Sequence, residues 1–273
     1  MKLRHKYALI TGATGGMGMA VAKAFREEGS NLILVAPKPE RLEVMRKTLL
    51  RIHAPGSIFT NAADVTHNFW MRKMLEEHSA IHIFVSCAGI YGPIGKLEDV
   101  DPMSWWKAIT TNLFGSVLPC QQLLPIFKKQ NWGRIILLSG GGATKPMPNF
   151  SAYASSKAAV VRFGETLAEE VKGYNISVNS VAPGALNTKM LDEVLAARPN
   201  DVGHPFYQKN LKQKREGGDS LEQAAALITQ LASDPGGRVS GKLISAKWDV
   251  WQDWETFVTA ASNPERFVLR RTV

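Results

Sequence analysis

Residues 11–18 read Thr11-Gly12-Ala13-Thr14-Gly15-Gly16-Met17-Gly18. An apolar run at residues 7–10 precedes this glycine-rich stretch and predicts a strand, while residues 17–28 have helical spacing. Glycine permits a positive φ and lets backbone N–H groups approach a phosphate closely, and a helix N-terminus adds partial positive charge. A glycine-rich turn alone predicts only a connection, but a strand, a turn and a helix in this order predict a dinucleotide-binding unit.

Strands and helices alternate along the chain beyond this turn. Apolar runs predict strands at residues 31–35, 57–62, 81–86, 134–138 and 175–181. Helical spacing occupies residues 40–51, 69–78, 105–129 and 156–172. Such alternation predicts an α/β fold, a doubly wound parallel sheet of the Rossmann type with helices on both faces in a three-layer α/β/α arrangement.

The regular alternation stops after Pro183. Residues 187–219 are polar and basic and contain several prolines and glycines, which favours a mobile lid or substrate loop. A helix at 221–231 and a strand at 242–245 follow. We therefore expect one domain over residues 1–246 with a substrate loop at 187–219. The tail at 247–273 contains Trp248, Trp251 and Trp254, which we expect to pack against the domain or a neighbouring subunit.

Composition narrows the class of protein. Of the 273 residues, 45% are hydrophobic, yet no apolar run approaches the roughly 20 residues that a membrane-spanning helix needs. We therefore expect a soluble, cytoplasmic protein with no membrane partner. Cys87 and Cys120 have no metal-ligand spacing, so we expect neither a disulfide nor a metal site.

The net charge of +9 is concentrated in places, notably at Lys209, Lys212, Lys214 and Arg215. A solvated helix face and a patch that binds anions both explain this cluster, because positive charge alone is weak evidence for a partner. An anionic substrate is therefore one option. No recognised nucleic-acid motif accompanies the charge, so we expect no nucleic-acid partner.

Tyr153 and Lys157 lie four residues apart, so on a helix their side chains project from one face. A phenol has a pKa of about 10 and is a poor base until a nearby cation favours the phenolate. A lysine, together with the positive ring of an oxidised nicotinamide, supplies that bias. Taken alone, this spacing is more often that of ordinary helix residues.

Several ordered motifs nevertheless resemble those of the classical short-chain dehydrogenases/reductases: the glycine turn, Asp64-Val65, Cys87-Ala88-Gly89, Asn112, Tyr153-Ala154-Ser155-Ser156-Lys157 and Pro183-Gly184. The likeness extends from about Lys6 to Ser245. It implies an NAD(P)(H)-dependent oxidoreductase that interconverts a carbonyl and a secondary alcohol. It also implies assembly into a homodimer or homotetramer.

The resemblance assigns roles to individual residues. Tyr153 would be the acid/base, Lys157 would hold the nicotinamide ribose and lower the pKa of the phenol, and Asn112 would kink a central helix and hold a proton-relay water. It also places Gly12, Gly16 and Gly18 at the phosphates, Asp64 at the adenine, Ala88 and Gly89 along the cofactor, and Thr188 at the carboxamide. The further positions that it places around the cofactor are Thr14, Met17, Val65, Pro183 and Gly184.

The choice between NAD and NADP depends on the residues after the second strand, where an acidic side chain binds the ribose hydroxyls of NAD. Here the chain reads Val35-Ala36-Pro37-Lys38, without a carboxylate. Lys38 favours NADP because it can pair with the 2′-phosphate. An exposed turn lysine explains the residue equally well.

The chain departs from the family pattern thirteen residues before the tyrosine, where the family has a serine and this sequence has Gly140. Ser139 lies one place early, and in a strand that shift turns a side chain to the opposite face unless the glycines bend the backbone. Either Ser139, Thr144 or Asn149 donates instead while Gly140 makes room for a bulky substrate, or the redox step needs no serine.

Two other functions stay open for the same fold. A non-catalytic dinucleotide-binding or scaffold protein would tolerate Gly140, although it would have little physical need for both Tyr153 and Lys157. A dehydratase or epimerase with a tightly held cofactor uses the same pair for transient oxidation.

Overall fold

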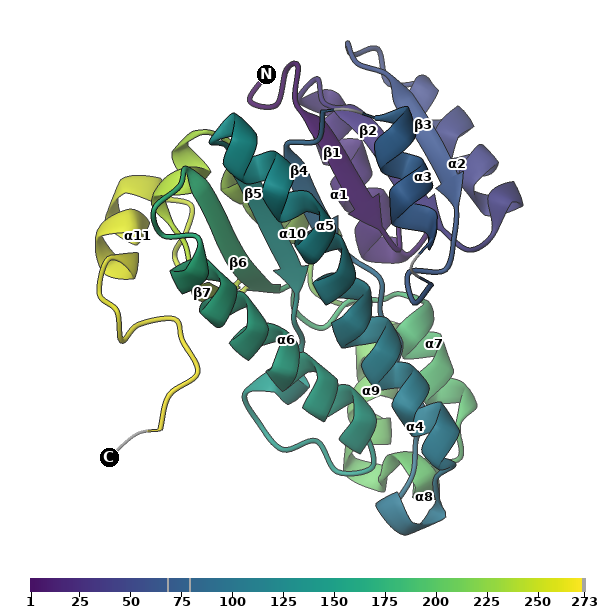
Figure 1. Cartoon of the computed structure of the whole chain (residues 1–273). Coiled ribbons are helices and arrows are strands. Elements are labelled where there is room, and N and C mark those ends of the chain that lie inside the picture. Colours follow the sequence, from purple (N-terminus) through teal and green to yellow (C-terminus); the bar gives the residue numbers. More distant parts are fainter. Residues whose placement is uncertain (68, 79, 272–273) are drawn as a thin grey trace.

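The computed structural model describes residues 1–67, 69–78 and 80–271. In that part of the chain seven strands form one parallel sheet in the order β3-β2-β1-β4-β5-β6-β7 (Figure 1). The strands are β1 (Tyr7–Thr11), β2 (Asn31–Ala36), β3 (Ile58–Ala62), β4 (Ile83–Ser86), β5 (Gly133–Leu138), β6 (Ile176–Ala182) and β7 (Lys242–Ser245). The predicted doubly wound sheet is confirmed.

Helices cover both faces of this sheet, and none within the described residues is long and apolar enough to cross a membrane. The α-helices are α1 (Gly16–Glu27), α2 (Pro39–Leu50), α3 (Phe69–Glu77), α4 (Pro102–Ile109), α5 (Gly115–Gln130), α6 (Ser151–Glu170), α7 (Lys189–Ala196), α8 (Pro199–Val202), α9 (His204–Glu216), α10 (Leu221–Ala232) and α11 (Trp254–Ala261). Shorter turns are η1 (Leu97–Asp99), the π-helical η2 (Thr110–Phe114), η3 (Gly141–Ala143) and η4 (Pro235–Arg238).

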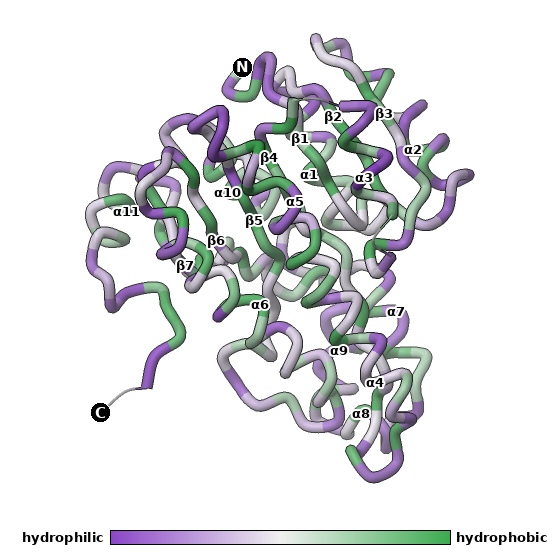
Figure 2. Tube along the Cα trace, viewed as in Figure 1, coloured by the Kyte–Doolittle hydropathy of each residue, from purple (hydrophilic) through white to green (hydrophobic). Residues whose placement is uncertain are grey.

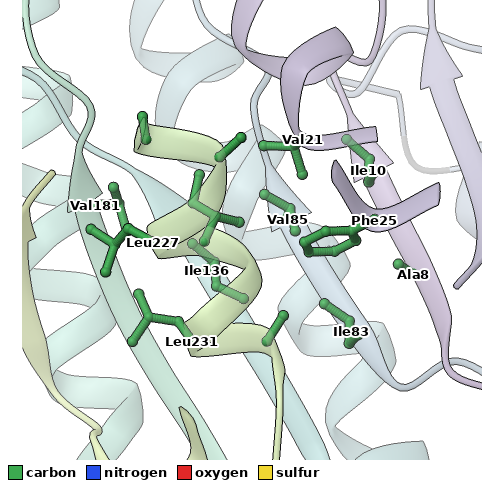
Figure 3. Close-up of a cluster of buried hydrophobic side chains, with 14 of the residues drawn as sticks. Ala8, Ile10, Val21, Phe25, Ile83, Val85, Ile136, Val181, Leu227 and Leu231 are labelled. Carbon is green, nitrogen blue, oxygen red and sulfur yellow. The ribbon is translucent and has the colours of Figure 1, made fainter. Parts of the chain in front are cut away.

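The core consists of two apolar layers, one on each face of the sheet. Along β1, Ala8 and Ile10 pack with α1, α2 and α10, whereas Leu9 packs with α3, α5 and α6. Figure 3 shows the first of these layers, and the central strands are predominantly hydrophobic in Figure 2. Burial on both faces explains why these strands are continuous apolar runs rather than alternating patterns.

The strand order places the carboxyl ends of β1 and β4 side by side. Successive crossovers run outward in one direction from β1 to β3 and in the other from β4 to β7, so the order reverses between these two strands. In open α/β sheets, ligands bind at this reversal because the loops diverge there and leave a crevice. The glycine turn after β1 and the Ala88-Gly89 segment after β4 both lie at this point.

The segment over residues 187–219 is more regular than the predicted loop, because α7, α8 and α9 occupy most of it. Its prolines and glycines delimit helices. Pro199 is at the start of α8, Gly203 separates α8 from α9 with φ 90°, and Gly217 ends α9 with φ 98°. Proline is tolerated in the first helical turn and glycine adopts positive φ, so both residue types suit helix ends as well as loops.

The predicted helix at 105–129 is also wrong in its start and in its continuity. It starts earlier, where the Asp101 carboxylate accepts a hydrogen bond from Ser104 N at 2.7 Å and caps α4. The π-helical turn η2 then separates α4 from α5. A π-helical turn inserts an extra residue into the helical ladder and so changes the direction of side chains after it.

The tail packs on the body of the same chain through two of its three tryptophans. Trp251 is buried and its Nε1 donates to Ala246 O at 3.0 Å, and Trp254 Nε1 donates to Pro235 O at 3.3 Å, while Trp248 is exposed. The chain then returns along the free edge of β7, where Leu243 N donates to Phe267 O at 2.7 Å. Contacts with a neighbouring subunit stay a prediction.

Phe25→Ala should lower the free energy of unfolding by about 3–5 kcal/mol, because the Phe25 ring is fully buried between α1 and the sheet and its loss leaves a cavity. Phe69→Ala is the matched control, since Phe69 at the start of α3 is 81% exposed, and should change stability by less than about 0.5 kcal/mol. Urea unfolding measures both. Equal losses in the two variants would contradict this core.

Candidate active site

The glycine turn after β1 has the features of an anion-binding site. No side chain caps α1 at Gly15, and the first turn of α1 contains no acidic residue. The first N–H groups of a helix have no partner within the helix, so this uncapped end can bind a phosphate. A Cβ at Gly12, whose φ is 60°, would lie 2.5 Å from Ala88 N, and a Cβ at Gly18 would overlap Gly12 O. The residues present therefore fit a dinucleotide pyrophosphate.

The segment after β6 meets this turn. A Cβ at Gly16 would lie 2.6 Å from Thr188 Cγ2, so Thr188 at the start of α7 lies directly against the turn. Gly184 has φ 100°, and the next residue, Ala185, donates its N–H to Asp219 Oδ2 at 2.7 Å. Pro183, Gly184 and Thr188 therefore lie at the same edge of the sheet as the glycine turn.

Two cations lie beside the end of β2. Lys38 is exposed and directly precedes α2, and Arg41 in the first turn of α2 donates from Nη2 to Thr14 O at 3.0 Å. Sequence reasoning missed Arg41. The available signal was a second basic residue three positions after Lys38 in the sequence.

Asp64 and Val65 follow β3. The Asp64 carboxylate accepts hydrogen bonds from Thr66 N at 2.9 Å and Thr66 Oγ1 at 2.8 Å. Val65 is buried, and a Cβ at Gly115 would lie 2.7 Å from Val65 Cγ2. Val65 therefore packs against the start of α5, while Asp64 stays exposed.

Asn112 joins three elements of the site. It lies in the π-helical turn η2, and its side chain accepts a hydrogen bond from Ile90 N at 2.8 Å and donates to Ile90 O at 2.9 Å. The same amide donates to Ser156 Oγ in α6 at 2.8 Å. The Asn112 amide therefore fixes the loop after β4 against α6, at the π-helical turn between α4 and α5.

Tyr153 and Lys157 both lie in α6 and are buried, with 9% and 5% of their surface exposed. Lys157 Nζ donates to Leu138 O, at the end of β5, at 2.7 Å. A Cβ at Gly89 would lie 3.4 Å from Lys157 Nζ and 3.3 Å from Asn112 Oδ1. Segments from four separate parts of the chain thus meet around this pair.

Burial shifts the pKa values of Tyr153 and Lys157 in opposite directions. It lowers the pKa of Lys157 to about 8 and raises the pKa of Tyr153, to which the neighbouring Tyr91 phenol adds. At neutral pH Tyr153 is therefore a protonated phenol, and Lys157 is mostly an ammonium. The lowered phenol pKa that the resemblance implies stays a prediction.

Gly140 lies directly against the hydroxyl of Tyr153, which a Cβ at this position would overlap. The φ of −170° is extended backbone that any residue adopts, so the constraint is space alone. Ser139 Oγ is buried and makes no hydrogen bond with any residue that the structure describes. The structure therefore does not bring Ser139 into hydrogen-bond contact with Tyr153.

Gly140→Ala should destabilise the protein by about 1–3 kcal/mol, because the added methyl group must displace the Tyr153 hydroxyl. Gly141→Ala is the matched control, since a Cβ there would meet nothing within 4 Å, and should change stability by less than about 0.5 kcal/mol. Thermal unfolding of the two variants makes the comparison. Equal stability of both variants would refute this placement of Tyr153.

Comparison with known proteins agrees with this arrangement. Residues 6–199 match the family model described as short chain dehydrogenase. A short chain dehydrogenase of Pseudocercospora fijiensis is 31% identical over 267 residues, which cover 91% of this chain and 82% of that protein. Levodione reductase of Leifsonia aquatica is 28% identical over 251 residues, covering 89% and 93% of the two chains.

Solved structures show the same fold. The crystal structure of levodione reductase superposes with a TM-score of 0.81 at 25% identity, over 92% of this chain and 98% of the other. NAD+-bound xylitol dehydrogenase superposes with a TM-score of 0.78 at 23% identity, over 90% and 98%. Since the family model matches well over half of the sequence, the chain belongs to the short-chain dehydrogenases/reductases, a family of Rossmann-fold oxidoreductases that use NAD or NADP.

Proposed function

We propose that this protein is an NAD(P)(H)-dependent oxidoreductase that interconverts a carbonyl and a secondary alcohol. The observation that carries the proposal is the meeting of Gly89, Asn112, Tyr153 and Lys157 at the carboxyl edge of the sheet, beside an uncapped glycine turn. This arrangement combines a site for a dinucleotide with a proton donor, which is what reduction of a carbonyl requires. The name of the related levodione reductase points to the same class of reaction.

In the proposed mechanism the bound nicotinamide supplies or accepts the hydride at the substrate carbon. Tyr153 handles the proton: in reduction its hydroxyl donates a proton to the substrate oxygen as the C=O double bond becomes a C–O single bond. Burial raises the pKa of Tyr153, so the phenol holds a proton at neutral pH, and a nearby cation that lowers this pKa makes it a better donor. The Lys157 ammonium stabilises the phenolate that remains.

Asn112 acts on this step through position. Its amide holds Ile90, and its bond to Ser156 fixes α6, whose Ser156 Oγ in turn donates to Tyr153 O at 2.7 Å. A displacement of the reacting groups by about 1 Å can cost a factor of about 10² in rate, so such anchoring matters for turnover.

We further propose that Gly140 occupies the position of the family serine. The missing hydroxyl would cost about 10²–10³ in rate if no other donor replaces it. We therefore expect the protein to bind the nucleotide normally and to turn over more slowly than a family member with the serine. A non-catalytic binding protein of the same fold is the alternative, and Gly140 is the feature that favours it.

NADP is the proposed cofactor. No carboxylate lies at Pro37 or Lys38, directly after β2, and the two cations Lys38 and Arg41 lie within one turn of each other. Lysine and arginine side chains bind phosphate through charge-assisted hydrogen bonds.

Titration with NADPH and NADH, followed by nucleotide fluorescence, tests the cofactor. NADPH should bind more tightly, and Lys38→Glu should weaken NADPH binding by about tenfold or more, because a charge-assisted hydrogen bond contributes about 1.5–3 kcal/mol. Lys129→Glu, the same charge change at the far end of α5, is the control and should have no effect. Equal affinity for both nucleotides would exclude the NADP preference, and binding of neither would overturn the proposed function.

Tyr153→Phe should lower kcat by a factor of about 10²–10⁴, which is the usual contribution of a general acid, while the Kd for NADPH stays within about threefold. The variant removes only the hydroxyl and keeps the ring in its buried place. Steady-state turnover of a ketone panel and nucleotide titration give the two values. If the wild-type protein binds NADPH but reduces no ketone, the non-catalytic alternative is favoured.

A further inference from the structure

Tyr153 belongs to a cluster of packed apolar side chains, here called the shell. Its other members come from the loop after β4, the segment before α6, and helices α7 to α9, and they include Tyr91, Ile94, Phe150, Val194, Val202 and Phe206. Phe150, Val194 and Val202 are buried like Tyr153, whereas the others are only partly buried. The shell therefore offers apolar surface that a small molecule next to Tyr153 can cover.

Aromatic rings form a continuous chain through this shell. Tyr91 packs edge-to-face with Tyr153 at a centroid distance of 4.7 Å and with Phe150 at 5.2 Å. Phe150 packs edge-to-face with Phe206 of α9 at 5.2 Å. Such contacts favour an aromatic or other apolar partner, because rings gain from edge-to-face packing in addition to burial.

The basic residues of α9 do not belong to this shell. Phe206 and Tyr207 lie in it, while Lys209, Lys212, Lys214 and Arg215 are all exposed. Lys214 pairs with Asp192 of α7 at 2.7 Å, and Lys212 pairs with Glu216 at 3.7 Å. The positive charge that made an anionic substrate attractive therefore faces solvent and is partly offset by neighbouring acids.

The charge on α7 next to the shell is negative. Burial raises the pKa of Tyr91 to about 12, and the Glu193 carboxylate adds to this shift, so a negative charge acts at the ring that contacts Tyr153. Lys189 offsets Glu193 in part, at 3.5 Å. An anionic substrate would have to lose water against apolar surface, which opposes its binding, whereas water screens the exposed pair of Lys189 and Glu193, whose side chains are 78% and 41% exposed.

A hollow of about 470 Å³ next to the shell offers no net positive charge either. It lies between the loop after β4 and α8 and shares Ile94 with the shell. The charged residues that line it balance: Lys96 and Arg198 face Asp99 and Asp201, and Arg198 pairs with Asp201 at 2.7 Å.

We infer that the substrate is an uncharged carbonyl compound or alcohol whose body is apolar and large enough to pack against the partly exposed rings of Tyr91 and Phe206. The inference rests on the proposed function, since it names the substrate class of the same site.

Three matched aryl ketones test it with NADPH: acetophenone, methyl 4-acetylbenzoate and 4-acetylbenzoate. The ester is uncharged and larger than the acid, so size and charge are separated. The kcat/KM values for acetophenone and the ester should exceed the value for the carboxylate by at least about tenfold, since the carboxylate must lose water without gaining a partner. A carboxylate that reacts as well as the ester would overturn the inference.

Variants of α7 and α9 show which side chains set the activity on the uncharged ketones. Phe206→Ala should lower kcat/KM for acetophenone about tenfold, mainly through KM, because it removes one apolar wall, and Phe206→Leu should retain most of the activity. Lys214→Glu, on the exposed side of the same helix, should leave the value unchanged. Glu193→Gln should narrow the preference for the ester over the carboxylate. Loss of activity in Lys214→Glu and not in Phe206→Ala would place the substrate on the basic face instead.

Equilibrium binding keeps this inference separate from the proposed function. Calorimetric titration of the NADP+-saturated protein with each ketone measures affinity without turnover. Tighter binding of the uncharged ketones without any reduction would reject the proposed redox function and retain the substrate class. Reduction of other ketones, with no binding of acetophenone or its ester, would reject the substrate class and retain the function.

Discussion

The side-chain amide of Asn112 binds both backbone groups of Ile90, and the arrangement of the site depends on this pairing. A loop that leaves the end of a strand has no ladder partners, so a side chain that satisfies its N–H and C=O together holds it in one place. The same amide reaches Ser156 of α6. The loop after β4, the π-helical turn and the helix with Tyr153 and Lys157 therefore form one hydrogen-bonded unit.

Close packing around Gly12 and Gly16 joins this hydrogen-bonded unit to the glycine turn after β1. Gly12 lies so near the Ala88 backbone that no side chain fits between them, and Gly16 lies against Thr188. The segments that follow β1, β4 and β6 consequently approach each other at one edge of the sheet. A flat cofactor that spans this edge can contact all three, which a looser arrangement with larger residues would prevent.

The contrast between the inner and outer faces of α7 and α9 gives the site its chemical character. Inward side chains pack on Tyr153 and Phe150, while outward side chains pair with each other in water. Exposed ion pairs contribute little to stability, commonly less than about 1 kcal/mol, so the apolar face is what holds these helices on the body. The surface that anchors the helices is thus the surface that lines the site.

The sequence by itself determined the doubly wound sheet and the set of motifs that meet at its edge. Apolar runs and glycine turns are local signals, and the spacing of Tyr153 and Lys157 on a helix needs no knowledge of distant residues. The position of a strand along the chain also predicts which loops share an edge, because parallel strands all end on the same side. The sheet was predictable for this reason, whereas the expected roles of Gly89, Asn112, Tyr153 and Lys157 came from the resemblance to the family.

Only the tertiary structure decided how space and charge are distributed around Tyr153 and Lys157. The absence of room for a Cβ at Gly140 depends on where the Tyr153 ring lies, and the contact of Arg41 with Thr14 O depends on how α2 packs beside the turn. Likewise, α7 to α9 looked like a loop because their prolines and glycines mark helix ends and loops alike. Contacts between residues far apart in the chain arise from packing of whole elements, and no local pattern of residues encodes them.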